Sequence, residues 1–240
     1  MATIITVLSG KGGTGKTLFA VNLGAYLALQ GKKVLIFDAD FHSRAVDLAL
    51  ELESRVIYDI VDVINGDCRI KQALVKSRRY EGLYIMEPPV LGNKGEISLL
   101  ETQVLLGRLK PDFDYIIVDT TGGLSSAAQT FAEVSDKVLL ITTQEPAAVR
   151  TGQSLISMLK DNGVKSISVI INKVRMKLSD EGYFLDVEDI AEELGVNVCG
   201  VIPEDENMHV AYNNGQVIVD IENSAAAEHL NHVIGRFLLT

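Results

Sequence analysis

The sequence predicts an α/β fold: a doubly wound, mostly parallel sheet of about seven to eight strands with helices on both faces. Two observations support this prediction. Apolar runs of strand length alternate along the chain with longer stretches that carry apolar residues at helical spacing. The strand-like runs are also hydrophobic throughout, without the polar alternation of a sheet that has one face in water. Strands joined by helices form right-handed βαβ units, and these build a sheet covered on both faces.

The expected strands follow one another along the whole chain. They lie near Ile4 and Val34 and at residues 83–86, 115–118, 138–141, 168–171 and 198–202. The prolines fall mostly where elements should end, at Pro88, Pro89, Pro111, Pro146 and Pro203. No repeat, low-complexity tract or linker interrupts this order, so residues 1–240 are expected to form a single domain.

Composition narrows the class of protein. A hydrophobic content of 47% suits an α/β domain with a large core, and the net charge of −10 disfavours an unspecific nucleic-acid binder. The two cysteines, Cys68 and Cys199, cannot make a disulfide framework. No apolar run approaches the roughly 18 residues of a membrane-spanning helix. Because the N-terminus begins directly in a strand-like run instead of a leader, the sequence favours a cytoplasmic protein.

The segment at residues 10–17 predicts a phosphate site. It reads Gly-Lys-Gly-Gly-Thr-Gly-Lys-Thr and matches the pattern G-x-x-x-x-G-K-[ST] at every fixed position. Glycines at positions 12, 13 and 15 let consecutive backbone N–H groups turn inward around a polyphosphate. The segment follows a strand-like run at residues 3–8 and precedes a helical pattern at residues 17–28, which is the order that this motif requires. We call residues 10–17 the P-loop.

Two side chains of the P-loop have distinct expected duties. Lys16 is placed to reach the β- and γ-phosphates, and the Thr17 hydroxyl is placed to ligate Mg²⁺. The positive end of the following helix also favours phosphate. Magnesium keeps several waters and needs few protein ligands, so Thr17 with a nearby carboxylate suffices.

Polar residues that follow other strands supply the partners. Asp38 and Asp40 come after the run near Val34, and Asp119 ends the run at 115–118. Asn172 and Pro203 follow later strands. Because ligands of such sheets bind beyond the carboxyl ends of the strands, we expect these residues to converge on the P-loop.

The second lysine of the P-loop, Lys11, narrows the family. A loop of the form Lys-Gly-Gly-x-Gly-Lys-Thr near the N-terminus resembles the deviant Walker ATPases of the MinD/ParA superfamily, which are P-loop NTPases. Four further segments resemble that family in order and spacing: 33–40, 115–119, 171–173 and 201–205. The resemblance spans nearly all of the chain. It is closest to the MinD branch, through residues 38–40, Arg44 with Asp47-Leu48, Val149-Arg150 and 201–205.

The resemblance implies an ATPase that uses ATP or ADP with Mg²⁺ and hydrolyses ATP slowly, stimulated by a partner. In that family, Asp40 resembles the residue that orients the attacking water, while Thr17, Asp38 and Asp119 match the positions at the metal. Lys16 and Lys11 complete the catalytic set. Lys11 matches a lysine that crosses an ATP-bound homodimer to the partner's phosphates, and it resembles an arginine finger in role.

The expected nucleotide-binding residues come from three segments. They are Gly10, Lys11, Gly12, Gly13, Thr14, Gly15, Lys16, Thr17, Leu18, Asn172, Pro203 and Glu204. Asn172 resembles the base-contacting residue, and Pro203 offers a carbonyl to the 6-amino group of adenine. A guanine site would want a carboxylate shortly after Asn172-Lys173, but Val174 and Arg175 follow. Glu145 matches a position that approaches the ribose across the dimer.

The sequence departs from the family pattern at three places. Residues 119–123 read Asp-Thr-Thr-Gly-Gly where the family often has Asp-Ser-Pro-Ala-Gly. Ala45 stands where the MinD branch commonly has asparagine, and Thr151 stands where an aspartate is usual. These departures bear on the hydrolysis rate and on the partner, and they leave nucleotide binding intact.

Two classes of biological role stay open. One is a spatial regulator that switches between an ADP monomer and an ATP dimer, for division-site placement or flagellar number control. The other is a ParA-like segregation ATPase or a metal-cofactor assembly ATPase. The acidic charge disfavours DNA, and the lack of a Cys-x-x-Cys pair disfavours metal delivery. We expect an activating or cargo protein as partner.

Membrane contact is a separate open question. Proteins of the MinD branch usually continue past their last core helix into a basic amphipathic helix that binds membranes, and this chain stops at Thr240. That segment is therefore expected to be absent. Peripheral attachment to the inner membrane face stays open.

Overall fold

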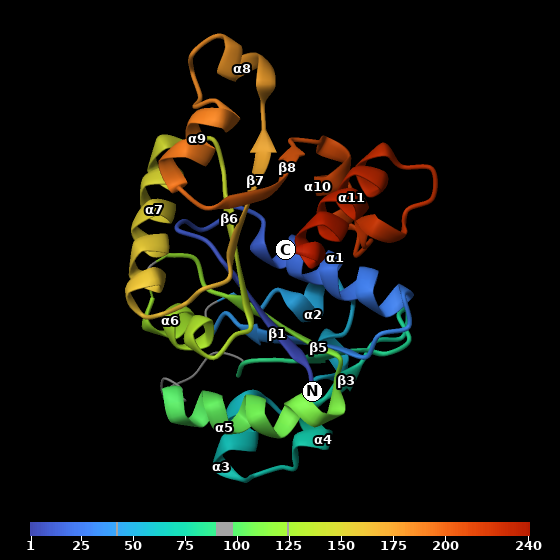
Figure 1. Cartoon of the computed structure of the whole chain (residues 1–240). Helices are drawn as coiled ribbons and strands as arrows, with labels where there is room; N and C mark the ends of the chain where they lie inside the picture. Colours follow the sequence, from blue (N-terminus) through green and yellow to red (C-terminus); the bar gives the residue numbers. More distant parts are fainter. Residues whose placement is uncertain (42, 90–97, 124) are drawn as a thin grey trace.

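The predicted sheet forms the centre of the molecule. The computed structural model describes residues 1–41, 43–89, 98–123 and 125–240 (Figure 1). Its strands are β1 (Thr3–Leu8), β2 (Val34–Ala39), β3 (Val75–Lys76), β4 (Leu83–Met86), β5 (Tyr115–Thr120), β6 (Lys137–Thr142), β7 (Ile167–Val174) and β8 (Asn197–Pro203). They form one sheet in the order β3-β4-β2-β5-β1-β6-β7-β8, and only β3 pairs antiparallel. The prediction of a doubly wound, mostly parallel sheet is confirmed.

Helices connect successive strands. They are α1 (Lys16–Leu29), α2 (Val46–Ala49), α3 (Ile60–Asn65), α4 (Ile70–Ala73), α5 (Leu99–Leu109), α6 (Ser126–Glu133), α7 (Pro146–Asp161), α8 (Met176–Asp180), α9 (Val187–Leu194), α10 (Glu206–Asn213) and α11 (Ala225–Leu239). Three short 3-10 helices lie at Glu53–Arg55 (η1), Lys110–Asp112 (η2) and Ile218–Asp220 (η3). Within the described residues, no helix is both long enough and apolar enough to cross a membrane.

Both faces of the sheet are buried, which explains the continuous hydrophobic runs. Along β1, Ile5 and Val7 pack into a core formed with α1, α2, α10, η3 and α11. Ile4 and Leu8, from the same strand, pack into two cores on the opposite face, formed with α3 to α7 and α9. Each strand therefore contributes alternate side chains to opposite layers, and a polar residue on either face would be desolvated.

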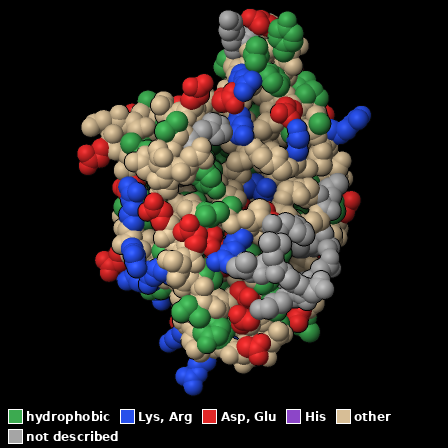
Figure 2. Space-filling view, turned by 180° about the vertical axis from the view of Figure 1, so that it is seen from behind, with side chains coloured by type: hydrophobic (Ala, Val, Ile, Leu, Met, Phe, Trp, Pro, Cys, Tyr) green, Lys and Arg blue, Asp and Glu red, His purple; other side chains and the backbone are tan. Residues whose placement is uncertain are grey.

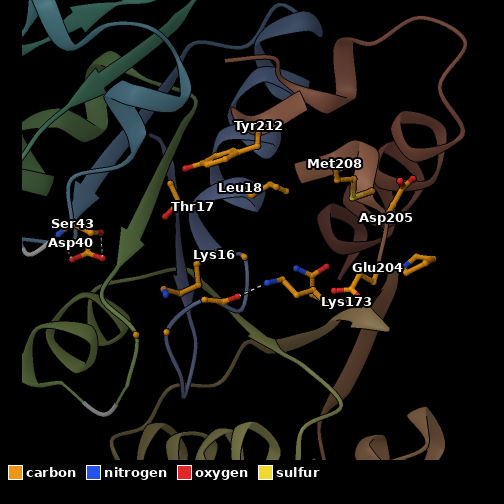
Figure 3. Close-up of a pocket in the computed structure, with 16 residues that line it drawn as sticks. Lys16, Thr17, Leu18, Asp40, Ser43, Lys173, Glu204, Asp205, Met208 and Tyr212 are labelled. Carbon is orange, nitrogen blue, oxygen red and sulfur yellow. Dashed lines mark hydrogen bonds between the residues drawn. The ribbon is translucent and has the colours of Figure 1, made fainter. Parts of the chain in front are cut away.

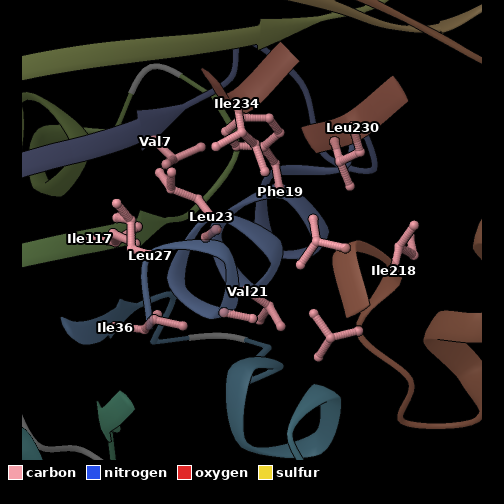
Figure 4. Packing of buried hydrophobic residues seen from close by; sticks show 14 of the residues in the cluster. Val7, Phe19, Val21, Leu23, Leu27, Ile36, Ile117, Ile218, Leu230 and Ile234 are labelled. Atoms are coloured by element: carbon pink, nitrogen blue, oxygen red, sulfur yellow. The ribbon is translucent and has the colours of Figure 1, made fainter. Parts of the chain in front are cut away.

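Helix α1 lies between the sheet and the C-terminal helix (Figure 4). Its Phe19 ring meets the ring of Phe237 from α11 edge-on, with centroids 6.5 Å apart. Leu23 and Leu27 are fully buried against the sheet. Because the sheet and α11 cover opposite sides of α1, the helix is hydrophobic almost all round. This packing fixes the helix that opens at the P-loop.

A projection around α8 extends beyond the sheet. Figure 1 shows it at the top of the molecule, past the carboxyl end of β7, and Figure 2 shows hydrophobic side chains on it from behind. Met176 and Tyr183 are 61% and 73% exposed there. Figure 1 also shows α10 and α11 beside α1, so the two C-terminal helices lie next to the first helix.

Candidate functional site

The P-loop joins the carboxyl end of β1 to the start of α1. Gly13 and Gly15 have φ of 77° and 99°, a left-handed conformation that favours glycine. A Cβ at Gly15 would also lie 2.4 Å from Nδ2 of Asn172. A Cβ at Gly122 would approach the backbone nitrogen of Gly12 to 2.8 Å, because the loop after β5 lies against the P-loop. The glycines are therefore required by both backbone conformation and close packing.

Side chains from outside the P-loop hold its carbonyl groups. Asn172 Nδ2 donates to the carbonyl of Thr14 at 2.7 Å, and Lys173 Nζ donates to the carbonyl of Gly13 at 2.8 Å. Ser9 Oγ donates to the carbonyl of Lys11 at 2.6 Å. These bonds anchor the loop carbonyls on β7 and on the end of β1. The sequence analysis assigned Asn172 to the base and did not foresee that its amide nitrogen supports the loop.

A cavity of about 430 Å³ opens beside the P-loop (Figure 3). Nine of the expected nucleotide-binding residues line it: Gly12, Gly13, Gly15, Lys16, Thr17, Leu18, Asn172, Pro203 and Glu204. Asp40, Ser43, Gly122, Lys173, Asp205, Met208 and Tyr212 complete the lining. The expected residues Gly10, Lys11 and Thr14 belong to the same loop but do not line the cavity. Segments from both ends of the chain thus meet at the carboxyl edge of the sheet, as predicted.

The residues expected at the metal lie together in the sheet. Asp38 and Asp119 are register partners on neighbouring strands, and both are buried. Thr17 Oγ1 donates to Asp119 Oδ2 at 2.5 Å. The other carboxylate oxygen, Asp119 Oδ1, is buried without a hydrogen-bond partner among the described residues. An oxygen-only donor set with one free carboxylate oxygen fits a hydrated Mg²⁺ ion, which takes few ligands from the protein.

Burial and mutual repulsion dominate the electrostatics of these carboxyl groups. Burial raises the pKa of Asp119 to about 7, against the opposing effects of the Thr17 hydrogen bond and of Lys16. Burial and the charge of Asp119 raise the pKa of Asp38 well above its usual value. Burial lowers the pKa of Lys16, while Asp119 and Asp40 act against that shift. The site carries more buried negative than positive charge, so a divalent cation would relieve it.

Asp40 is held in the cavity wall by the loop that follows β2. Its carboxylate accepts from the Ser43 backbone N–H at 3.1 Å and from Ser43 Oγ at 2.7 Å (Figure 3). Its own N–H donates to Asp38 Oδ1 at 2.8 Å. Ser43 was not predicted as a site residue. The Asp-x-x-Ser spacing is the only local signal for it, and such turns are common outside active sites.

A further buried carboxyl group lies behind this loop. Glu87 follows β4 and is fully buried, with neither carboxyl oxygen hydrogen-bonded among the described residues. Arg44, whose φ is 38°, pairs with Asp47 at 2.5 Å and lies 3.6 Å from Glu87. Burial, followed by the charges of Asp38 and Asp47, raises the pKa of Glu87 to about 10, while Arg44 acts against this shift. Glu87 is therefore a neutral acid in the folded protein near pH 7.

Lys11 pairs with Glu145 of its own chain. The two charged groups form an ion pair just before α7, and their side chains are 51% and 47% exposed. Exposed ion pairs contribute about 0–1 kcal/mol, so this contact exchanges easily for a stronger one. The two residues that the resemblance assigns to contacts across a dimer thus bind each other within one chain.

Helix α10 supplies residues that the sequence analysis missed. Met208 and Tyr212 line the cavity together with Leu18, and Asp205 caps the helix by accepting from the Asn207 N–H at 2.8 Å. Arg175 Nε pairs with the carboxylate of Glu204 beside the cavity. Met208 and Tyr212 are four residues apart after Pro203, a spacing that places them on one face of a helix. That pattern was available in the sequence, but a packing face explains it equally well.

Comparisons with known proteins agree with this geometry. The family model described as the CobQ/CobB/MinD/ParA nucleotide binding domain matches residues 5–218. The septum site-determining protein MinD of Synechocystis sp. is 37% identical over 219 residues, which cover 91% of this chain and 82% of the relative.

Two solved structures are similar over nearly the whole chain. The MinC:MinD cell division protein complex of Aquifex aeolicus matches with a TM-score of 0.91 and 32% identity, covering 100% of this chain and 97% of that one. The septum site-determining protein MinD of Pyrococcus horikoshii complexed with Mg-ADP matches with a TM-score of 0.86 and 26% identity, covering 98% and 95%. The resemblance read from the sequence is confirmed. The chain belongs to the CobQ/CobB/MinD/ParA family of nucleotide-binding domains, and its similar relatives are MinD proteins.

Proposed function

We propose that residues 1–240 form one ATPase domain of MinD type. It binds Mg·ATP in the cavity beside the P-loop, hydrolyses it slowly, and acts in division-site selection as a switch between an ADP monomer and an ATP homodimer. The observation that carries the proposal is the meeting of Lys16, Thr17 and the half-satisfied Asp119 carboxylate at one cavity. The MinD names of the relatives and the Mg-ADP bound to one of them support the proposal.

The chain's own residues divide the work of binding. The P-loop N–H groups and Lys16 bind the phosphates, while Thr17, Asp38 and Asp119 hold Mg²⁺ directly or through its waters. When bound, the metal neutralises charge on the phosphate oxygens. Asn172 and Lys173 keep the loop carbonyls anchored outside, so the P-loop is formed before the nucleotide arrives. Leu18, Met208 and Pro203 give the nucleoside an apolar wall.

Asp40 is assigned to the attacking water. Two hydrogen bonds from Ser43 fix its carboxylate in the cavity wall, which leaves the group oriented before substrate binds. Hydrolysis of a phosphate anhydride requires little covalent chemistry from the protein, so water orientation and charge stabilisation dominate. Ala45 offers no polar side chain beside this loop. We therefore expect a slow basal rate of ATP hydrolysis, and a protein partner would order the attacking water further.

The dimerisation step is assigned to Lys11 and Glu145. In the single chain they neutralise each other near the cavity mouth. In an ATP-bound dimer, Lys11 reaches the partner's phosphates and Glu145 approaches the ribose. The ion pair between Lys11 and Glu145 then breaks, and each side chain forms a more strongly charged or better-buried contact. A protein partner would then recognise the dimer, as the Aquifex aeolicus MinD forms a complex with MinC.

The proposal predicts adenine over guanine. Arg175 pairs with Glu204 beside the cavity, and no carboxylate stands one or two residues after Lys173 to accept from guanine. We therefore expect GTP to displace a fluorescent ATP analogue at least about tenfold more weakly than ATP does. Phosphate release from ATP should depend on Mg²⁺ and stop with EDTA. Equal displacement by GTP, or Mg²⁺-independent release, would contradict the assignment.

A further inference from the structure

Tyr212 is the aromatic side chain in the wall of the nucleotide cavity. It projects from α10 across Leu18, and its hydroxyl points toward Thr17 rather than toward the Met208 and Glu204 side of the cavity (Figure 3). The ring packs partly buried against the large core around α1. Among the described residues, no hydrogen-bond partner of the Tyr212 hydroxyl is found. The hydroxyl is therefore available to a ligand in this cavity.

Burial and nearby negative charge act on the Tyr212 hydroxyl in the same direction. Burial raises the pKa of the Tyr212 phenol, and the negative charges of Asp119 and Asp38 raise it further. Both aspartates lie at the strand ends beneath Thr17. The hydroxyl thus keeps its proton throughout the neutral range and is available as a hydrogen-bond donor.

Packing alone does not account for a tyrosine here. A phenylalanine would fill the same place between Leu18 and the core, without a polar atom in the half-buried wall. A phenol at this position instead offers a donor on the Thr17 side of the cavity, next to the P-loop that would bind the phosphates (Figure 3). Hydrogen bonds from neutral donors to ionised oxygens are among the stronger ones in proteins.

We propose that Tyr212 is a nucleotide-binding residue whose hydroxyl donates a hydrogen bond to an anionic oxygen of the bound polyphosphate. The inference rests on the proposed function and adds to it a contact from α10 to the phosphates. This bond ties α10 to the nucleotide from the side opposite Asn172 and Lys173. The polyphosphate is then held by the P-loop and by α10 together, while β7 supports the P-loop.

The test compares Tyr212→Phe with wild type by titration calorimetry of Mg·ADP. Loss of one hydrogen bond to a charged oxygen is expected to weaken binding about tenfold. Tyr183→Phe removes an exposed hydroxyl on the projection around α8 and should bind like wild type. The chain has no tryptophan and seven tyrosines, so the change in tyrosine emission on ADP binding should also shrink in Tyr212→Phe.

Two further ligands separate a phosphate contact from a sugar contact. With 2′-deoxy-ADP and 3′-deoxy-ADP, the ratio of wild-type to Tyr212→Phe affinity should stay about tenfold. A ratio that falls to one with either analogue would assign the hydroxyl to the ribose and overturn the proposal. Equal ADP affinity of Tyr212→Phe and wild type would also overturn it. Wild type that binds no ADP at all would instead overturn the proposed function.

Discussion

Replacing Lys16 by alanine is expected to weaken Mg·ATP binding by at least about 100-fold. Lys16 is buried, with a relative exposure of 7%, and it lines the cavity together with Thr17 and Asp40. Burial lowers its pKa, while the charges of Asp119 and Asp40 act against that shift. Removing it leaves the two carboxylates without their cation and repels the incoming polyphosphate. Titration calorimetry with Mg·ATP measures the loss.

A matched lysine at the other end of the same helix provides the control. Lys32 follows α1 and is exposed, so Lys32→Ala should bind Mg·ATP like wild type. Circular dichroism checks that Lys16→Ala is folded before its affinity is measured. Affinity of folded Lys16→Ala within a few-fold of wild type would refute the placement of the phosphates at this cavity.

Replacing Glu87 by glutamine is expected to stabilise the protein in alkaline solution. The pKa of Glu87 is about 10 in the folded protein, against a usual value of 4.5, so the folded state holds a proton that the unfolded state releases between these limits. Stability of the wild type therefore falls as pH rises through this window, by on the order of 3 kcal/mol at pH 7. Glutamine resembles the neutral acid in shape and does not titrate.

Urea unfolding at pH 5, 7 and 8.5, with EDTA present, measures this effect. Glu87→Gln should match wild type at pH 5 within about 1 kcal/mol and exceed it increasingly at higher pH. Asp38 and Asp119 also titrate with raised pKa values, so the comparison is made between the two proteins at each pH. Glu81→Gln changes an exposed glutamate beside β4 and should follow wild type. If the free energies of unfolding of Glu87→Gln and wild type change in parallel with pH, Glu87 is charged in the folded protein and the prediction is wrong.

Most of the fold was predictable because its signals are local. A hydrophobic run, a glycine loop and a helical pattern each occupy a few consecutive residues, and their order determines the parallel sheet. The strand β3 was not predicted. It has two residues, Val75 and Lys76, and it pairs antiparallel at the edge of the sheet. Two residues carry no measurable periodicity, and their pairing depends on β4 already being in place.

In the site, too, the residues of a local motif could be predicted and the long-range contacts could not. The P-loop is one continuous motif, so Lys16 and Thr17 could be assigned from sequence. The hydrogen bond by which Asn172 supports the loop joins residues 158 positions apart, so no local pattern predicts it. The contact of Asn172 with the base stays a prediction. In the sequence, Glu87 begins a Glu-Pro-Pro segment that is typical of a turn, so its side chain would be expected to face solvent. Only the packing of β4 against β2 buries that carboxyl behind Arg44.

Light scattering of three proteins tests whether the protein is a nucleotide-dependent switch. Wild type, Lys11→Ala and Asp40→Ala are each measured with Mg·ADP and with Mg·ATP at tens of micromolar protein, roughly the range in which weak interfaces are still populated. All three should be monomeric with ADP. With ATP, Asp40→Ala should accumulate as a dimer because it closes over the nucleotide without turning it over.

Lys11→Ala should keep much of its ATP affinity, because Lys16 lines the cavity and Lys11 does not. It should nevertheless stay monomeric with ATP and lose turnover, since no cation crosses to the partner's phosphates. The predicted result is that Asp40→Ala forms dimers with ATP and that Lys11→Ala does not. If Lys11→Ala dimerises like wild type, or if Asp40→Ala with ATP is monomeric, the switch is contradicted and the chain is a monomeric nucleotide-binding module.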